Sequence, residues 1–371
     1  MADRFRIAII GQTGKGDYGH GLDVMWSDVP GAEVVAICDE DAAGRAKAQE
    51  RSGAKKAYAD YREMLDKEKP DVVTIGARWI DRHHEYMLAC AERGCHVFTE
   101  KPFCRNLTEA DEIVDAFHRK HLKLAMALQT HYSPLIGVVK KMIAEQKLGT
   151  ILELRGRGKE DKRGGGEDLW VLGTHIVDLM RVFAGDPTSC YATLMQNGKP
   201  VKKADVVEGN EGLGPLAGDA VDAQYAFANG VHGYFASHRG QGGSPSRFGL
   251  QIYGSKGVLE ILTGYVPSVK FLGDPGWSPA RSKNKEWANV SSNGLDKPES
   301  LKPGPGSGQH LGNVAAGKDL LAAIREDREP LAGLEVARGA VEMVMAVFES
   351  HRVGGPVALP LKNRKHPLGM L

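Results

Sequence analysis

The amino-terminal part of the sequence predicts an α/β domain with a doubly wound parallel sheet. The chain has 371 residues, which exceeds the size at which one hydrophobic core keeps growing, so we expect two domains. Short apolar runs alternate with segments of helical spacing up to about residue 128, and this alternation is typical of parallel strands joined by helices. A glycine-rich turn follows the first apolar run, as expected for a sheet that opens a ligand site at its carboxyl edge.

Five apolar runs in this part are expected to be buried strands of the sheet. Helices are expected between them, one ended by Gly94 and another opened by a capping box of Thr108 and Asp111. The expected strands are 5–11, 33–39, 71–77, 95–99 and 124–128, and the expected helices are 41–51, 81–93 and 108–120.

Composition limits the classes of function and the compartment. Apolar residues make up 42% of the chain and charged residues 26%, as in an ordinary soluble globular protein. Lys and Arg number 48 against 47 Asp and Glu, so no basic field for nucleic acid or for an anionic membrane is expected. The five cysteines lack a zinc-type spacing, and no stretch approaches a membrane-spanning run. We therefore expect a cytoplasmic protein with reduced thiols, without a metal site and without a membrane or nucleic-acid partner.

The loop after the first strand is the first candidate binding element. It carries glycines at 11, 14, 16, 19 and 21, with Thr13 between the first two. Glycines at such a place let the backbone approach a pyrophosphate, which then rests on the amides of the following helix. The spacing is not the standard G-x-G-x-x-G, because two residues separate Gly11 from Gly14.

Asp39 ends the second expected strand, 23 residues after Gly16. A carboxylate there accepts the hydroxyls of the adenosine ribose and repels a 2′-phosphate, so NAD is expected rather than NADP. Two alternatives stay open: Asp39 could cap the helix over 41–51, and the nearby Arg45 keeps NADP as a second candidate cofactor.

The tripeptide Glu100-Lys101-Pro102 ends the fourth expected strand. In a doubly wound sheet this position is the carboxyl edge, where ligands bind, so Lys101 is a candidate for chemistry. The alternative is an ordinary turn with a solvated lysine.

Together these features resemble the Gfo/Idh/MocA family, the glucose-fructose oxidoreductase and inositol dehydrogenase type of NAD(P)-dependent oxidoreductase. The resemblance runs nearly end to end and rests on the order and spacing of several short motifs. Besides the glycine-rich loop, these are His83 placed 17 residues before Glu100, Gly94-x-His96-Val97 before Glu100-Lys101-Pro102, Lys147-Leu148-Gly149, Gly173-Thr174-His175-Ile176-Val177-Asp178, Tyr253-Gly254-Ser255-Lys256-Gly257 and a closing helical region from about His310 to His351.

The resemblance implies a Rossmann domain over residues 1–128, which binds NAD or NADP, and an α+β domain over residues 129–371 with an open, mainly antiparallel sheet. The second domain would bind the substrate and form a homodimer or homotetramer through the open sheet. Alternating runs between about Tyr191 and Leu262 fit such a sheet. The implied activity is hydride transfer between a nicotinamide cofactor and a hydroxyl group of a sugar, sugar derivative or polyol.

The resemblance also implies roles for individual residues. Lys101 would hydrogen-bond the reacting hydroxyl oxygen and stabilise a developing alkoxide, His175 would take the proton, and Asp178 would orient His175 or its helix. The implied cofactor contacts are Gly11, Thr13, Gly14, Gly16, Asp39, Arg45, Ala77, Trp79, His83, Glu100 and Lys101. The implied substrate contacts are His131, Tyr132, Asp168, Trp170, Thr174, His175 and Asp178.

Three positions depart from the family pattern. Val171 stands one turn before His175, where the family usually has an Asp, and neither Asp168 nor Glu167 has the spacing to replace it. Trp79 lies in a segment that replaces the usual Thr-Pro-Asn, and either stacks on a ligand or is simply buried. His131 stands where the family commonly has an Arg.

Two further expectations concern mobility and net reaction. The loop over 156–167 is rich in glycine and charge, so it is expected to be mobile and to close over a ligand. Because of Val171, two alternatives to net dehydrogenation stay open. One is redox-neutral cleavage of a glycosidic bond with NAD kept bound, and the other is a non-catalytic NAD-binding sensor.

Overall fold

The structure is a computed structural model that describes residues 4–276, 285–304 and 308–371. The chain divides into two compact units, which are described separately. Unit 1 comprises Met1–Gln129, Gly209–Gly214 and Gln309–Val341, and unit 2 comprises Thr130–Glu208, Pro215–Gly308 and Glu342–Leu371. The expected division into 1–128 and 129–371 assigned both returning segments of unit 1 to the second domain.

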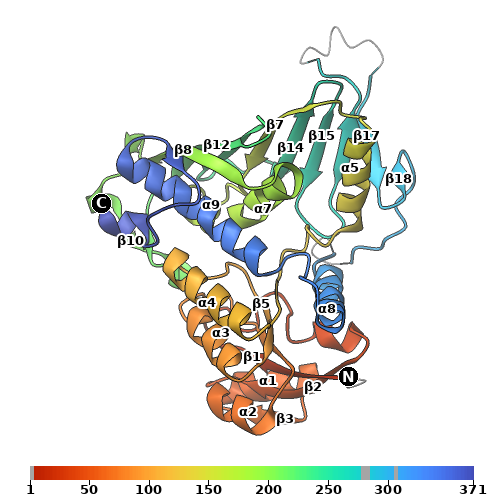
Figure 1. The fold of residues 1–371 in the computed structure, drawn as a ribbon, viewed down its shortest axis with the longest axis vertical. Coiled ribbons are helices and arrows are strands. Elements are labelled where there is room, and N and C mark those ends of the chain that lie inside the picture. The colour runs from red at the N-terminus through yellow and green to blue at the C-terminus, as the bar shows by residue number, and fades with distance from the viewer. Residues whose placement is uncertain (1–3, 277–284, 305–307) are drawn as a thin grey trace. The chain divides into compact units, whose positions relative to one another are not determined.

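Unit 1 contains a six-stranded parallel sheet in the order β3-β2-β1-β4-β5-β6 (Figure 1). The strand order reverses between β1 and β4, the place where doubly wound sheets bind ligands. The five expected strands are confirmed, and the short edge strand β3 is added to them. The strands are β1 (Phe5–Ile10), β2 (Ala32–Cys38), β3 (Lys56–Tyr58), β4 (Val72–Ile75), β5 (His96–Thr99) and β6 (Leu124–Met126).

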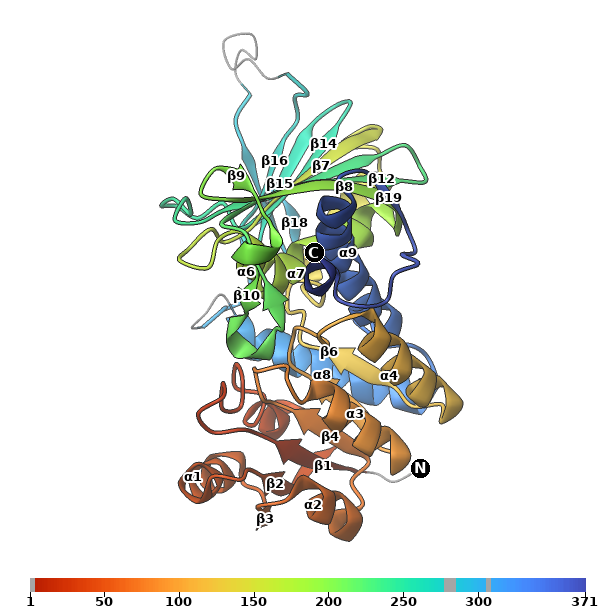
Figure 2. The same ribbon diagram turned by 90° about the vertical axis from the view of Figure 1, so that its left-hand side faces the viewer.

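Helices cover this sheet, and polar caps fix where they begin. Asp41 caps α1 by accepting from the amide of Gly44, and Asn106 caps α4 by accepting from the amide of Glu109. The expected capping box at Thr108 is therefore wrong, because that residue lies inside the first turn. Helices α1 and α2 contact β1 to β3, α3 contacts β4 and β5, and α8 contacts β6 (Figure 2). The helices are α1 (Ala42–Ser52), α2 (Tyr61–Glu68), α3 (His83–Glu92), α4 (Leu107–Arg119), α8 (Gln309–Glu326) and α9 (Leu334–Val353), the last of which begins in unit 1 and ends in unit 2.

The segment between β1 and β2 differs from the sequence-based expectation. All its residues are described, and it forms turns and the short 3-10 helix η1 (Met25–Asp28) instead of an α-helix. Gly14, Gly16, Gly19 and Gly21 have φ between 59° and 83°, and Asp17 has φ 52°. Because a right-handed helix needs negative φ, these residues prevent it. The helix N-terminus expected to hold a pyrophosphate is therefore absent from this segment.

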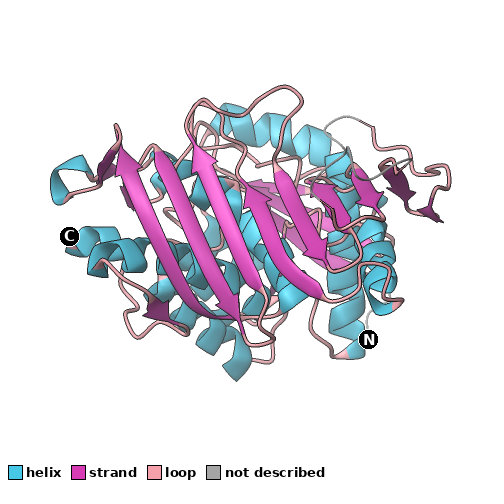
Figure 3. Cartoon of the chain, turned by 90° about the horizontal axis from the view of Figure 1, so that it is seen from above, coloured by secondary structure: helices cyan, strands magenta, loops and turns pink. Residues whose placement is uncertain are grey.

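Unit 2 is built on an eleven-stranded sheet, seen face-on in Figure 3. The order is β18-β17-β16-β15-β14-β7-β13-β12-β8-β19, with β9 also paired to β8. Only β7 and β13 pair in parallel among these strands, so the expected mainly antiparallel sheet is confirmed. The strands are β7 (Ile151–Arg157), β8 (Pro187–Gln196), β9 (Lys199–Pro200), β12 (Ala220–Phe227), β13 (His232–His238), β14 (Gly249–Gly254), β15 (Val258–Leu262), β16 (Val269–Leu272), β17 (Ala288–Ser291), β18 (Gly294–Leu295) and β19 (Val357–Ala358), and a separate pair is β10 (Val207–Glu208) with β11 (Pro215–Leu216).

The large sheet is covered on one face and exposes residues on the other. Helix α7 contacts β7, β13 and β14, helix α6 contacts β12 and β13, and α5 contacts β17. On the opposite face Tyr191 and Tyr234, in one row across β12, are 49% and 39% exposed. This alternation of buried and exposed residues is typical of a half-buried antiparallel sheet. The helices are α5 (Pro134–Ala144), α6 (Gly166–Val171) and α7 (Gly173–Ala184), with short 3-10 helices at Lys203–Asp205 and Pro367–Met370. The 3-10 helix at Asn210–Gly212 belongs to unit 1.

Candidate active site

Glu100 and Lys101 follow directly after β5, at the carboxyl edge of the parallel sheet. The carboxylate of Glu100 is completely buried and connects two segments of unit 1. Its Oε1 accepts hydrogen bonds from the amide (3.0 Å) and the ring of His20 in the glycine-rich loop. Its Oε2 accepts a hydrogen bond from the amide of Lys101 at 2.9 Å. Glu100 therefore fixes the glycine-rich loop and the lysine backbone to one another.

The ionisation of Glu100 follows from these contacts. Burial alone would raise its pKa, but the imidazole of His20 and the charge of Lys101 outweigh burial and lower the pKa to about 2. The carboxylate is therefore ionised at neutral pH, and its oxygens accept hydrogen bonds from His20 and Lys101 inside the protein. This geometry gives Glu100 a positioning role behind Lys101, which is itself 3% exposed.

Two further side chains extend this network in unit 1. Asn313 of α8 donates to the carbonyl oxygen of His20 at 3.0 Å, and Gln129 donates to Asn313 at 3.1 Å. His83 is completely buried, with Nε2 2.8 Å from the carbonyl oxygen of Ala77 and Nδ1 3.0 Å from that of Pro102. The predicted cofactor contacts His83 and Ala77 thus lie together, and the buried ring of His83 connects Ala77 to Pro102, the residue after Lys101.

The acid at the end of β2 is also held inside the protein. Asp39 is 1% exposed, and its Oδ2 accepts from the amide (3.0 Å) and the hydroxyl (2.7 Å) of Thr13. Its Oδ1 accepts from the amide of Asp41, and Asp41 is the residue that caps α1. The alternative that Asp39 caps this helix is therefore wrong. Arg45 donates to the carbonyl oxygen of Asp39 at 2.6 Å, so the three predicted residues Thr13, Asp39 and Arg45 form one cluster.

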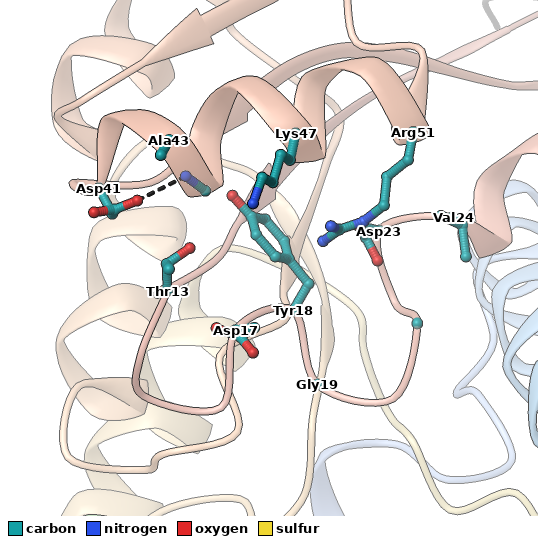
Figure 4. A pocket seen from close by; sticks show the side chains of 12 residues that line it. Thr13, Asp17, Tyr18, Gly19, Asp23, Val24, Asp41, Ala43, Lys47 and Arg51 are labelled. Atoms are coloured by element: carbon teal, nitrogen blue, oxygen red, sulfur yellow. Dashed lines mark hydrogen bonds and ion pairs between the residues drawn. The ribbon is translucent and has the colours of Figure 1, made fainter.

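A cavity of about 700 Å³ lies between the glycine-rich loop and α1 (Figure 4). Tyr18 packs on Gly11 so closely that a Cβ there would lie 2.1 Å from its ring. Arg51 pairs with the buried Asp23 and lies 4.9 Å from the centre of the Tyr18 ring. The lining residues are Thr13, Asp17, Tyr18, Gly19, Gly21, Asp23, Val24, Asp41, Ala43, Gly44, Lys47 and Arg51.

The glycine-rich loop keeps backbone donors available beside this cavity. Among the described residues, the amides of Gly16, Tyr18 and Gly21 have no hydrogen-bond acceptor. Gly16 also allows close packing, because a Cβ there would lie 2.4 Å from Cβ of Arg78. Trp79 is half-buried and lies under Lys15, whose Nζ is 5.6 Å from the ring centre. The predicted loop residues and Trp79 are therefore neighbours in unit 1.

In unit 2 the structure pairs two predicted substrate contacts. Nδ1 of His131 lies 3.1 Å from both carboxylate oxygens of Asp178, and Asp178 is 2% exposed. His175 lies one turn before Asp178 on α7, and its ring meets Phe248 edge-on with a centroid distance of 6.4 Å. The ring partner that the structure shows for Asp178 is therefore His131 and not His175. Tyr132, next to His131, is 8% exposed.

The remaining predicted substrate contacts are buried in unit 2. Asp168 is completely buried, accepts from the amide of Glu160 at 2.9 Å and from the hydroxyl of Ser237, and has its pKa raised by burial. Trp170 is 1% and Thr174 is 3% exposed. These three positions are therefore in the interior of unit 2.

The loop after β7 is closely packed in this structure, and its expected closure over a ligand stays a prediction. Glu160 is 1% exposed and accepts from Arg157, from Arg247 and from the amide of His238. A Cβ on Gly165 or Gly166 would lie within 2.3 Å of the carbonyl oxygens of Gly218 and Ala217. The glycines allow two backbones to touch, and Glu160 connects the loop to Arg157, Arg247 and the amide of His238.

Several residues of the site were missed from the sequence. Tyr18, Lys47 and Arg51 line the cavity, and His20 and Asn313 hold the network around Glu100. The spacing of Lys47 and Arg51, four residues apart, is a signal that places both on one face of a helix. No local signal links Asn313 to the loop at His20, because 293 residues separate them. Among the described residues no cluster of three or more His, Cys, Asp or Glu side chains could hold a metal ion.

Two family profiles match most of the chain. Residues 5–128 match the NAD-binding Rossmann fold of the Gfo/Idh/MocA oxidoreductase family. Residues 140–359 match the C-terminal α/β domain of the same family.

Among curated proteins, levoglucosan dehydrogenase of Pseudarthrobacter phenanthrenivorans is 28% identical, over 62% of this chain and 65% of that protein. D-apiose dehydrogenase of Paraburkholderia graminis is 29% identical, over 55% of this chain and 56% of that protein. The chain thus spans between about half and two thirds of the length of these relatives.

Solved structures share the fold over nearly the whole chain. Levoglucosan dehydrogenase in complex with NADH and levoglucosan has a TM-score of 0.76 at 21% identity, covering 96% of this chain and 100% of that one. An oxidoreductase from Agrobacterium radiobacter in complex with NAD+, L-tartaric acid and magnesium has a TM-score of 0.72 at 19% identity, covering 96% and 98%. With both domain profiles matched in order, the chain belongs to the Gfo/Idh/MocA family of oxidoreductases.

Proposed function

We propose that the protein is an NAD-dependent oxidoreductase that transfers a hydride between a nicotinamide cofactor and a hydroxyl-bearing carbon of a sugar, sugar derivative or polyol. The observation that carries the proposal is the position of Lys101 at the carboxyl edge of the parallel sheet, fixed by the buried Glu100 to the glycine-rich loop. A buried, preorganised cation at this edge can stabilise negative charge that develops on a substrate oxygen. Family membership and the sugar dehydrogenases among the relatives support this chemistry.

The residues of unit 1 fit a dinucleotide. The amides of Gly16, Tyr18 and Gly21 are donors that a pyrophosphate can use without displacing an existing hydrogen bond. Thr13 and Asp41 face the cavity and can meet the adenosine ribose, while Asp39 holds Thr13 from behind. When bound, the oxidised nicotinamide supplies the hydride acceptor. The carboxylates of Asp39 and Asp41 at this end of the cavity disfavour a 2′-phosphate on the ribose, so we propose NAD rather than NADP.

Lys101 and His175 would contact the reacting hydroxyl group. Lys101 would donate a hydrogen bond to the oxygen, so the negative charge of the alkoxide forms beside a fixed ammonium group. His175, 9% exposed at the start of α7, would share the proton of the same hydroxyl.

The proposal is tested by incubating the protein with NAD+ and each of levoglucosan, D-apiose, D-xylose and myo-inositol, and by recording NADH. We expect accumulation of NADH with at least one compound. Lys101→Ala and His175→Ala are each expected to lower kcat by about 100-fold or more. Turnover at the wild-type rate in both variants would refute the assignment.

A redox-neutral glycosidase is the second candidate. Two observations favour it: Val171, 2% exposed and apolar, stands one turn before His175, and proteins of glycosyl hydrolase family 109 are among the relatives, at 28% identity over 37% of one of them. Cleavage of a glycoside without accumulation of NADH would select this reaction. Accumulation of NADH with a free sugar would exclude it.

We also propose that the uncovered sheet face forms a homodimer. Tyr191 of β8 and Tyr234 of β13 lie in one row on either side of β12, both opposite Gln224, and they are 49% and 39% exposed. An aspartate in place of Tyr234 would introduce charge into such an interface and is expected to yield monomers in light scattering. The control is Leu331→Asp, which changes an exposed apolar residue of unit 1 with 53% of its surface accessible. An unchanged mass for Tyr234→Asp would exclude this face.

A cytoplasmic location is proposed from the thiols. Cys38, Cys90, Cys95, Cys104 and Cys190 are all buried and unbridged, as is common in a reducing compartment. Separately, no helix in the described ranges has the length and apolar character that a membrane crossing needs.

A further inference from the structure

The pair His131 and Asp178 in unit 2 has the geometry of an acid–base dyad. Both carboxylate oxygens of Asp178 lie 3.1 Å from Nδ1 of His131, so Nδ1 must carry a hydrogen and donate it. In the neutral ring Nε2 then carries the lone pair. Nε2 forms no hydrogen bond with any of the described residues, and the side chain keeps 9% of its surface exposed. The pair therefore presents one proton-accepting atom.

The backbone on both sides of His131 is fixed within unit 2. Thr130 accepts a hydrogen bond from the amide of Gly264 at 2.8 Å, and the amide of Ser133 donates to the carbonyl oxygen of Thr130 at 3.1 Å. Ser133 then caps α5 through the amide of Leu135. His131 is thus held in a closed turn, and its ring orientation is fixed by Asp178. Such preorganisation lowers the reorganisation needed when a proton arrives.

Asp178, the acid of the dyad, is on the same helix as His175. Asp178 follows His175 by three residues on α7, so the two side chains share one face of the helix. The carboxylate serves His131, although the sequence alone paired it with His175 or with the helix. Among the described residues of unit 2, the charged group in contact with the His131 ring is Asp178, and the ring centre of Tyr132 lies 6.1 Å from that of His131.

We propose that His131, oriented by Asp178, is the group that takes the proton from the substrate hydroxyl, while His175 binds that hydroxyl. This inference rests on the proposed dehydrogenase function and names its base. Oxidation of a carbinol releases a hydride, for which NAD is the acceptor, and a proton. The O–H bond breaks, an N–H bond forms at Nε2, and the imidazole becomes an imidazolium whose charge is stabilised by the carboxylate of Asp178. The reverse reaction returns the same proton to the carbonyl oxygen.

The first test reads the tautomer and needs no substrate. Hydrogen–nitrogen correlation spectra of wild-type protein labelled with isotopic histidine, recorded at alkaline pH, are expected to place the hydrogen of neutral His131 on Nδ1. Asp178→Asn is expected to lose this preference. A wild-type ring that carries its hydrogen on Nε2 would overturn the proposal, because the accepting atom would be blocked.

The second test measures turnover with whichever of levoglucosan, D-apiose, D-xylose or myo-inositol the wild type oxidises. His131→Ala and His131→Gln are expected to lower kcat by about 100-fold or more. The dissociation constant for NADH, followed by its fluorescence, is expected to stay within about twofold of the wild type. Added imidazole is expected to restore part of kcat in His131→Ala, because a free base can enter the space that the side chain leaves. The glutamine variant keeps the proposal testable if the alanine variant does not fold.

The matched control is the pair His238 and Asp222, whose atoms are 3.2 Å apart but whose side chains are 42% and 56% exposed. His238→Ala is expected to keep wild-type kcat and to show no effect of imidazole. Two results would overturn the base assignment while leaving the dehydrogenase function standing. One is that the wild type turns over and His131→Ala has the same kcat. The other is that kcat falls in His131→Ala and added imidazole does not restore any of it. Absence of turnover by the wild type with every compound counts against the function and, with it, this inference.

Discussion

Replacing Glu100 with Gln tests the buried network that fixes Lys101. Glutamine keeps the shape of the side chain but removes its charge, so it imitates the protonated acid. The carboxylate is completely buried and accepts from His20 and from the amide of Lys101. An uncharged side chain at this position can satisfy those donors only in part.

The magnitude follows from the pKa of Glu100. A fall from 4.5 to about 2 means that the folded protein favours the ionised form. At about 1.4 kcal/mol per pKa unit, the ionised form contributes about 3 kcal/mol to the free energy of unfolding. Glu100→Gln is expected to lose most of this amount at pH 7. For a unit of this size we expect a fall in Tm of about 5 °C or more.

The pH dependence has a fixed sign. Because the pKa is lower in the folded protein, the contribution is complete above pH 4.5 and is lost as the pH falls towards about 2. The difference in stability between wild type and Glu100→Gln should therefore shrink progressively over this range.

The matched control is Glu85→Gln. Arg82 lowers the pKa of Glu85 to about 2 as well, but the side chain of Glu85 is 38% exposed. Solvent screening limits its contribution to about 1 kcal/mol or less, and salt should weaken it. The assay is urea denaturation, with hydrogen exchange of peptides from β5 to locate the change in unit 1. A stability loss for Glu100→Gln no larger than that of the control, or one that persists unchanged at pH 3, would refute the reasoning.

Three further substitutions test other parts of the site. Ser237→Ala removes a donor from the buried carboxylate of Asp168 and is expected to lower the free energy of unfolding by about 1–3 kcal/mol in urea titrations. Gly165→Ala is expected to lower Tm, because φ is 92° and the new Cβ would lie 2.3 Å from a carbonyl oxygen; a calorimetric scan checks it. Thr13→Val removes the hydroxyl held by Asp39 and is expected to weaken NADH binding by about 10-fold or more in fluorescence titration.

The strands of unit 1 were predictable because parallel strands buried on both faces read as continuous apolar runs, such as Phe5–Ile10 and Val72–Ile75. The boundaries of the helices were less predictable. Asn106 rather than Thr108 caps α4, since a capping signal within the first turn can occur by composition alone. The turn structure after β1 was missed because glycines permit a phosphate-binding helix start and a positive-φ loop equally well.

Long-range contacts account for what the sequence could not show in the site. Asp178 pairs with His131 across 47 residues, and no periodic pattern records this choice over His175. Asp39 was correctly placed at the strand end, but its burial beneath Thr13 depends on the packing of the glycine-rich loop. The return of 309–341 to unit 1 similarly depends on contacts of α8 with β6 and η1.

The central claim is most directly tested by following one hydrogen. A sugar or polyol from the panel, deuterated at the carbon that bears the reacting hydroxyl, is incubated with NAD+ and the wild-type protein, and the dinucleotide is analysed by mass spectrometry. The account predicts that deuterated NADH accumulates together with the oxidised sugar, and that Lys101→Ala slows the formation of both by about 100-fold or more. Absence of deuterated NADH while a glycoside is cleaved, or unchanged accumulation in Lys101→Ala, would contradict it.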